Sequence, residues 1–256
     1  MVRGRKMRTA IGVWSMNDQA FVKSIGEDIL LTCPDYCKTI FNRDRAFYLD
    51  AEQFALRYLK LYMSEYLLRL DGSIIGAAIF EDQVRVTIYG KDKPRNIYPM
   101  ANTIILDTEL CQTRNSHGSG KGRYRFTLMH EVSHQLLARL GFAHPEPVMY
   151  RTIHEPTLPD ERLADQLAAY LLMPDSTLLS MMRMRDYKPY ICYENVMPVH
   201  ETKEIHQMAD ILQVSYTALQ KRLHSAGLLE YRPIYEYNDP HRRFFDPIGR
   251  RMPFEK

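Results

Sequence analysis

The chain has 256 residues, with 34 Lys and Arg against 31 Asp and Glu, for a formal net charge of +3. Hydrophobic residues make up 45% and charged residues 25% of the chain, ordinary values for globular proteins that exclude disordered and fibrous classes. Because the charge is nearly balanced, a nucleic-acid surface has to be a local patch rather than a property of the whole chain.

Four cysteines are scattered through the chain without a CxxC pair, at positions 33, 37, 111 and 192. This spacing argues against a disulfide framework or a thiolate zinc site and favours a reducing compartment. The first residues lack the continuous apolar stretch of a secretory signal, and nowhere do 18 apolar residues run together. We therefore expect a cytoplasmic protein without a membrane-spanning segment.

Residues 1–45 are turn-rich and predict no clear element, so we expect an N-terminal extension there. Over 49–70 the apolar residues follow a helical pattern, which predicts a helix and leaves open a strand after it. Three runs rich in β-branched residues predict antiparallel strands, at 74–80, 83–89 and 103–106. The proline-containing stretch 94–99 between the last two predicts a loop.

The stretch 114–122 is polar and glycine-rich, which predicts another loop. A helical pattern then begins near Tyr124 and stops at Gly141, where a C-cap glycine is expected. Three prolines predict that 141–158 is largely loop, and a second helix is predicted over 159–172.

Residues 202–229 predict two or three short helices, whereas the tail over 231–256 shows no periodicity. We therefore expect three parts: the extension of 1–45, a core of 46–195 and a C-terminal helical segment with its tail, 196–256.

The helix predicted from Tyr124 contains an H-E-x-x-H motif, formed by His130, Glu131 and His134. Residues four apart share one helical face, so both imidazoles can bind one metal ion with Glu131 beside them. Two imidazoles suit zinc, and Glu131 is placed to take a proton from a zinc-activated water and pass it to a leaving amine. In a chain of this length and composition, random placement of the residues would produce this motif with a probability of roughly 0.02. On the motif alone, the alternative is two surface histidines on an amphipathic helix.

The surrounding residues favour a buried metal site. Apolar residues form a stripe that fixes this helix against the core: Met129, Val132, Leu136, Leu137 and Leu140. A catalytic zinc needs a third protein ligand and an open position. In the second helix, Glu161 could complete a His, His, Glu site, and Asp165 could accept the other ring N–H of a liganding histidine. The alternative is that both carboxylates are solvated residues near the start of an isolated helix.

The stretch RFTLMHEVSH, residues 125–134, and the stretch ERLADQLAAYLLMP, which begins at Glu161, together resemble the ImmA/IrrE family of zinc metallopeptidases. In that family an R-F-T-x-x-H-E-x-x-H helix is paired with a helix that reads E-x-x-A, then Asn or Asp, and ends in L-L-M-P. The resemblance covers about residues 45–230. Leu167 departs from the usual Phe, and a glycine-rich insertion precedes Arg125.

The resemblance implies that one Zn²⁺ per chain is bound by His130, His134 and Glu161. Glu131 is then the catalytic general base, and Asp165 supports a liganding histidine. The implied fold is α+β, with a small antiparallel sheet packed on the H-E-x-x-H helix and on the second ligand-bearing helix, a zincin-like minimal core, followed by a C-terminal helical segment. Characterised members typically cleave a DNA-binding repressor. The implied function is a zinc-dependent endopeptidase acting on a helix-turn-helix repressor of a mobile element or a stress response.

A second hypothesis concerns residues 205–229, which have the pattern of a helix-turn-helix with Gln213 where such a turn usually has glycine. A DNA reader needs a basic recognition face, and the basic residues available are Lys221, Arg222 and His224. From residue 196 onward the net charge is only +1, so we favour a packing or substrate-docking role over direct nucleic-acid binding. The alternative function is a non-catalytic regulatory module that acts on DNA or on a repressor through 200–229.

The group that stabilises an oxyanion is left open by the sequence. Candidates lie in the loop between the two helices or near the motifs: His144, His154, Tyr124, Tyr150 and Tyr170. The basic cluster at 241–243 and the pair at 250–251 could dock an acidic partner, with a solvated tail as the alternative.

Overall fold

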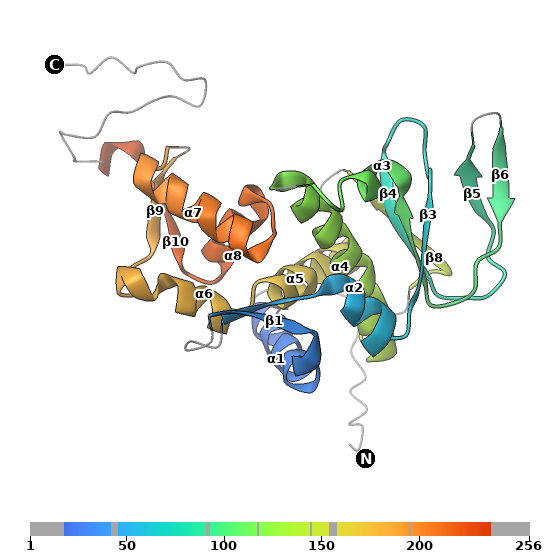
Figure 1. Cartoon of the computed structure of the whole chain (residues 1–256), viewed down its shortest axis with the longest axis horizontal. Helices are drawn as coiled ribbons and strands as arrows, with labels where there is room; N and C mark the ends of the chain where they lie inside the picture. The colour runs from blue at the N-terminus through green and yellow to red at the C-terminus, as the bar shows by residue number, and fades with distance from the viewer. Residues whose placement is uncertain are drawn as a thin grey trace.

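The computed structural model describes residues 18–41, 46–90, 93–116, 118–143, 145–153, 158–194 and 196–236. Two helices form its centre, α4 over Ser119–Arg139 and α5 over Pro159–Leu172, and they pack along each other (Figure 1). A four-stranded sheet lies on one side of α4 and the C-terminal helices lie on the other. The expected α+β fold with a zincin-like core is confirmed.

The sheet has the strand order β3-β7-β4-β8. In this order the strands are Tyr62–Tyr66, Thr103–Asp107, Ile74–Ile79 and Val148–Thr152. β4 pairs antiparallel with β7 and β8, but β3 pairs parallel with β7, which corrects the expectation of antiparallel strands throughout. The reason is that β7 inserts between two strands that precede it in the chain, and a local strand pattern does not specify that order.

Two strands occupy stretches that were predicted to be loops. β8 lies within 141–158, where its pairing along β4 supplies the hydrogen bonds that the local sequence does not predict. β6, Pro94–Ile97, pairs antiparallel with β5, Val86–Tyr89, in a separate hairpin beside the sheet (Figure 1). Pro94 begins its strand at an edge, where the missing N–H of proline is tolerated.

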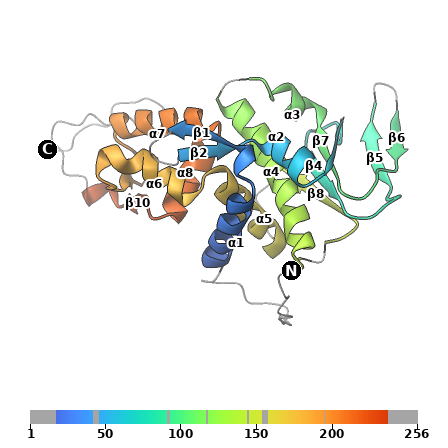
Figure 2. The same cartoon turned by 60° about the horizontal axis from the view of Figure 1, so that its bottom comes forward.

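The N-terminal part contributes α1, Asp18–Thr32, which packs against α5 (Figure 2). A hairpin of β1, Cys37–Phe41, and β2, Ala46–Leu49, follows it. The pattern at 49–70 forms a short helix and then β3. The remaining short elements are α2 at Ala51–Gln53, its π-helical continuation at Phe54–Tyr58, α3 at Thr108–Gln112, and 3-10 turns at Pro34–Tyr36, Arg183–Arg185 and Ile234–Glu236.

The C-terminal helices α6, α7 and α8 span Asp175–Met182, Val199–Leu212 and Tyr216–Ser225. Two helices therefore lie in 202–229, as predicted. β9, Tyr190–Tyr193, pairs parallel with β10, Leu229–Arg232. Gln213 in the turn between α7 and α8 has a φ of 56°, the left-handed conformation that glycine usually supplies.

The start of α4 differs from the prediction, since the helix begins at Ser119 and takes up part of the glycine-rich stretch. Helix propensity disfavours glycine there, but packing requires it. A Cβ on Gly122 would lie 2.4 Å from the backbone nitrogen of Ser215, in the turn between α7 and α8. The close approach of these two backbones explains a helical start that the local sequence does not indicate.

One hydrophobic core joins these parts, because buried side chains from Val22 on α1 to Leu229 on β10 form a continuous cluster. A smaller cluster on the other face of the sheet includes Ala77 and Ile105. Within the described ranges, no helix is both long enough and apolar enough to cross a lipid bilayer. Residues 237–256, which include the basic clusters of the tail, lie outside the described part of the chain.

Candidate metal centre

The two histidines of the H-E-x-x-H motif meet the carboxylate of Glu161 where α4 packs on α5. The Nε2 atoms of His130 and His134 are 2.9 Å apart, and both side chains are buried. One oxygen of Glu161 lies 3.1 Å from Nε2 of His130 and the other 3.2 Å from Nε2 of His134. Burial alone would raise the pKa of Glu161, but its close contacts with both imidazoles outweigh it and hold that pKa well below its usual range.

The spacing of these donor atoms fits a small tetrahedral ion. Ligand bonds of about 2.0–2.1 Å around a tetrahedral zinc place donor atoms about 3.3 Å apart, close to the observed separations of 2.9 to 3.2 Å. Two imidazoles and one carboxylate form a ligand set that leaves a fourth position open. The three residues thus form a group that could hold a metal ion.

Asp165, one turn after Glu161 on α5, contacts the other edge of the first imidazole. Its Oδ1 lies 2.8 Å from Nδ1 of His130, so the carboxylate accepts from the ring N–H and leaves the Nε2 lone pair facing the cluster. Nη1 of Arg151 donates to the same oxygen over 2.7 Å and also contacts Nδ1 of His130. Arg151 therefore holds the carboxylate that orients His130.

Glu131 is completely buried beside the cluster. Among the described residues, neither of its carboxylate oxygens has a hydrogen-bond partner. Burial raises the pKa of this carboxyl to about 7. Gly76 on β4 leaves room for it, since a Cβ there would lie only 2.6 Å from Oε1 of Glu131. A buried carboxylate with a pKa near neutral and unpaired oxygens is suited to accepting and returning a proton.

The three candidate tyrosines lie in different surroundings. Tyr150 is opposite Ala77 in the pairing of β8 with β4, one position away from Arg151 and hence on the face that points away from α4. The hydroxyl of Tyr170 donates to Glu27 over 3.2 Å. Tyr124 is buried in α4, six residues before His130, and its hydroxyl has no partner among the described residues. The other two candidates, at positions 144 and 154, lie outside the described residues.

Arg151 is the residue of this site that the sequence does not predict. It lay in a stretch assigned to a loop, and its place depends on the pairing of β8, which sets it opposite Gly76. The side chain also lies over the ring of Phe126, 5.5 Å from its centroid. Every second residue at 148–152 is β-branched or aromatic, namely Val148, Tyr150 and Thr152. This alternation is the signal that could have indicated the strand.

Arg125, the first residue of the R-F-T stretch, ties the C-terminal helices to the core. Its Nη1 donates to the carbonyls of Leu212 and Gln213 over 2.6 and 2.8 Å, and its Nη2 donates to the carbonyl of Leu49 over 2.7 Å. Burial lowers the pKa of the guanidinium to about 10, so it stays cationic at neutral pH. One buried cation thus joins α4 to the end of α7 and to the end of β2.

The basic residues of α8 make contacts within the protein. Arg222 is buried and pairs with Asp175, and Nδ1 of His224 lies 3.0 Å from the carbonyl oxygen of Leu229. The N-terminal end of α8 packs against α4 at Gly122. In a helix-turn-helix that reads DNA, this end of the second helix contacts base edges.

Residues 115–224 match the model of the Peptidase_M78 family, described as the IrrE N-terminal-like domain. The match covers both helices of the metal centre and most of the segment from α6 to α8, and it confirms the resemblance inferred from the paired motifs. It supports a metallopeptidase-type function. No curated protein matches the chain significantly.

Proposed function

We propose, from the match of residues 115–224 to the IrrE N-terminal-like domain, that this chain is a zinc-dependent endopeptidase of the cytoplasm that hydrolyses a peptide bond in a protein partner. The observation that carries the proposal is the buried cluster of His130, His134 and Glu161, with Glu131 beside it. These three residues would hold one Zn²⁺ per chain. A bound ion would supply a Lewis acid for the scissile carbonyl and a water with a pKa near neutral.

The remaining residues of the site orient the ligands and move the proton. Asp165, held by Arg151, accepts the Nδ1–H of His130 and fixes the tautomer that presents Nε2 to the ion. Glu131 takes the proton of the attacking water and returns it to the leaving amine. Gly76 supports this role by leaving the Glu131 carboxylate its place against β4.

The proposed substrate is a helix-turn-helix transcriptional repressor of a mobile element or a stress response. The support for this substrate is the family resemblance. The alternative is a non-catalytic regulatory module that acts on DNA or on a repressor through 200–229. Its DNA-binding form is disfavoured because Arg222 and His224 are engaged within the protein and the start of α8 packs on α4.

The test is incubation of the purified protein with the product of the adjacent repressor-like gene. Wild type should contain one zinc per chain and remove the intact repressor, whereas Glu131→Gln should bind zinc and cleave nothing. Glu81→Gln, which makes the same change at an exposed position, is the matched control and should cleave normally. Absence of stoichiometric zinc, or cleavage by Glu131→Gln, would contradict the peptidase. Cleavage of other proteins but not of the repressor would contradict only the substrate.

A further inference from the structure

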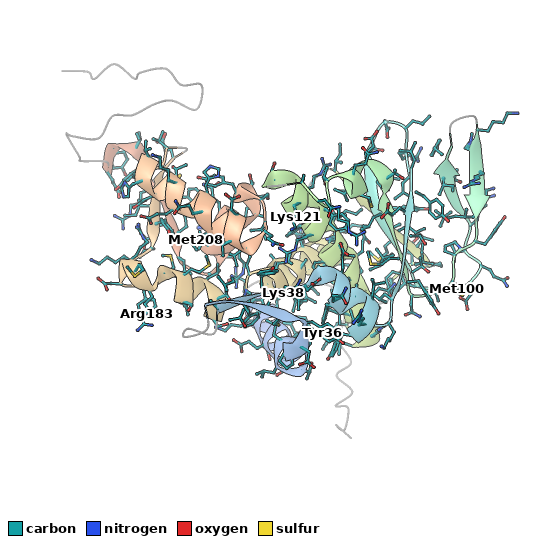
Figure 3. All side chains as sticks on the ribbon, viewed as in Figure 1. Tyr36, Lys38, Met100, Lys121, Arg183 and Met208 are labelled. Carbon is teal, nitrogen blue, oxygen red and sulfur yellow. The ribbon has the colours of Figure 1, made fainter. Side chains whose placement is uncertain are left out.

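A cleft of about 1020 Å³ lies next to the metal centre. Its walls come from the first half of α4, the first turns of α1, the end of β8, the middle of α5 and one face of α8. Figure 3 shows the side chains of these elements, with Lys121 marking the first turn of α4. The volume is at the upper end of the range typical of ligand sites, about 300–1,000 Å³, and is large enough for an extended peptide segment.

The cleft reaches the residues that surround the metal cluster. Arg151 and Asp165, which hold His130, both line it. Thr127 also lines it, and its methyl group and the carboxylate of Glu131 both lie against Gly76. A chain segment lying in the cleft would therefore contact the ligand-orienting pair, Arg151 and Asp165, and would be separated from Glu131 by Thr127.

The walls of the cleft are cationic. Its described lining contains five cationic side chains and two carboxylates, namely Lys23, Arg123, Arg151, Lys221 and Arg222 against Asp165 and Asp175. Both carboxylates already form ion pairs with cations of the same lining. The chain as a whole is nearly balanced, at 34 basic to 31 acidic residues, whereas cationic side chains outnumber carboxylates in this lining by five to two.

The shape of the site favours a peptide over double-stranded DNA. A reader of the major groove must be convex, because the groove receives a helix or a strand pair. Here α8 forms one wall of a concave site, and its N-terminal end is packed on α4. A cationic cleft beside a peptidase centre instead fits an extended chain that carries negative charge.

We propose that this cleft binds an acidic, extended segment of the protein substrate and leads it to the metal centre, an inference that rests on the proposed peptidase function. The segment from α7 to α8 then serves as a wall for substrate. Arg123, which is exposed on α4, and Lys221 on α8 contribute positive charge to the walls that receive the acidic side chains.

The test measures binding without cleavage. The zinc-loaded Glu131→Gln protein is titrated, with fluorescence anisotropy as the readout, into a labelled short peptide of alternating Glu and Ala. The same measurement is made with a Lys and Ala counterpart and with a short oligothymidine. We expect the Glu peptide to bind at least about tenfold more tightly than the Lys peptide, and its affinity to fall with added salt.

Substitutions in the same background locate the binding to the cleft. Arg123→Glu should weaken binding of the Glu peptide about tenfold, Arg123→Gln should weaken it less, and adding Lys221→Glu should weaken it further. Lys188→Glu makes the same charge change at an exposed position outside the cleft and should bind like the parent. Circular dichroism establishes that each variant is folded.

Equal binding of both peptides, tighter binding of oligothymidine, or unchanged binding by the Arg123 and Lys221 double variant would overturn the inference. These outcomes are separable from failure of the proposed function. A protein that binds the acidic peptide but whose wild type cleaves nothing contradicts the peptidase, whereas one that cleaves acidic and basic segments equally contradicts only the role of the cleft.

Discussion

Gly76→Ala tests whether the place of the Glu131 carboxylate is essential. The new Cβ would lie 2.6 Å from Oε1 and 3.2 Å from Cδ of Glu131, whereas ordinary contacts begin at 3.4 Å. The carboxylate must therefore move by about 0.8 Å. Because the side chain is completely buried, this movement displaces the proton acceptor and does not simply turn it into solvent.

The expected magnitude follows from that displacement. A misplacement near 1 Å typically lowers a rate about 100-fold, which corresponds to about 2.7 kcal/mol of lost transition-state stabilisation. None of the three metal ligands has an atom among the nearest neighbours of the added Cβ, so zinc affinity should stay within about threefold of wild type. Overpacking should lower the free energy of unfolding by about 1–3 kcal/mol.

The assay compares repressor cleavage and zinc affinity for wild type, Gly76→Ala and Gly90→Ala. Gly90 is the matched control, since the nearest atom to its Cβ would be the carbonyl oxygen of Lys93 at 3.6 Å, an ordinary contact. Cleavage by Gly76→Ala at the wild-type rate would refute the reasoning. So would a loss of rate that is explained entirely by lost zinc.

Asp165→Ala should lower zinc affinity about 10–100-fold, because it removes the acceptor that orients His130; competition with a chromophoric chelator measures this, and unchanged affinity would disprove the orienting role. Arg125→Met removes three hydrogen bonds to carbonyls and should lower the free energy of unfolding, measured in urea, by about 3 kcal/mol. A loss under about 1 kcal/mol would argue against a stabilising role for these hydrogen bonds. Chelation by EDTA should abolish cleavage and lower Tm, and zinc should restore both, because an ion that binds only the native state stabilises it; an unchanged Tm would contradict a ligated native state. Burial alone would raise the pKa of Asp175, but hydrogen bonds from Lys23 and Arg222 outweigh it and hold that pKa below its usual value. The resulting stability is complete above about pH 4 and is lost as the pH falls through the depressed native pKa, so acid unfolding of Asp175→Asn should depend less on pH, and an unchanged acid profile would contradict the pairing.

The ligand-bearing part of the site was predictable because its signals are local. Helical spacing alone brings His130 and His134 together, and the pattern of the next helix placed Glu161 within reach. The position of Arg151 was not predictable, because it depends on the pairing of β8 with β4 across a long stretch of chain. The start of α4 was not predictable for the same reason. Glycine is needed at 122 because the backbone there contacts the turn between α7 and α8, which lies far along the sequence.

The acceptors that hold Arg125 are all backbone carbonyls, from Leu49, Leu212 and Gln213. Every residue type carries that oxygen, so the tie constrains the path of the C-terminal chain and leaves its side chains unconstrained at these positions. Divergence among related proteins could therefore replace the residues that end α7 while the helix stays docked in place. The surface that α8 presents could in this way change its chemistry, and with it the choice of partner, without disturbing the helix that carries the metal site.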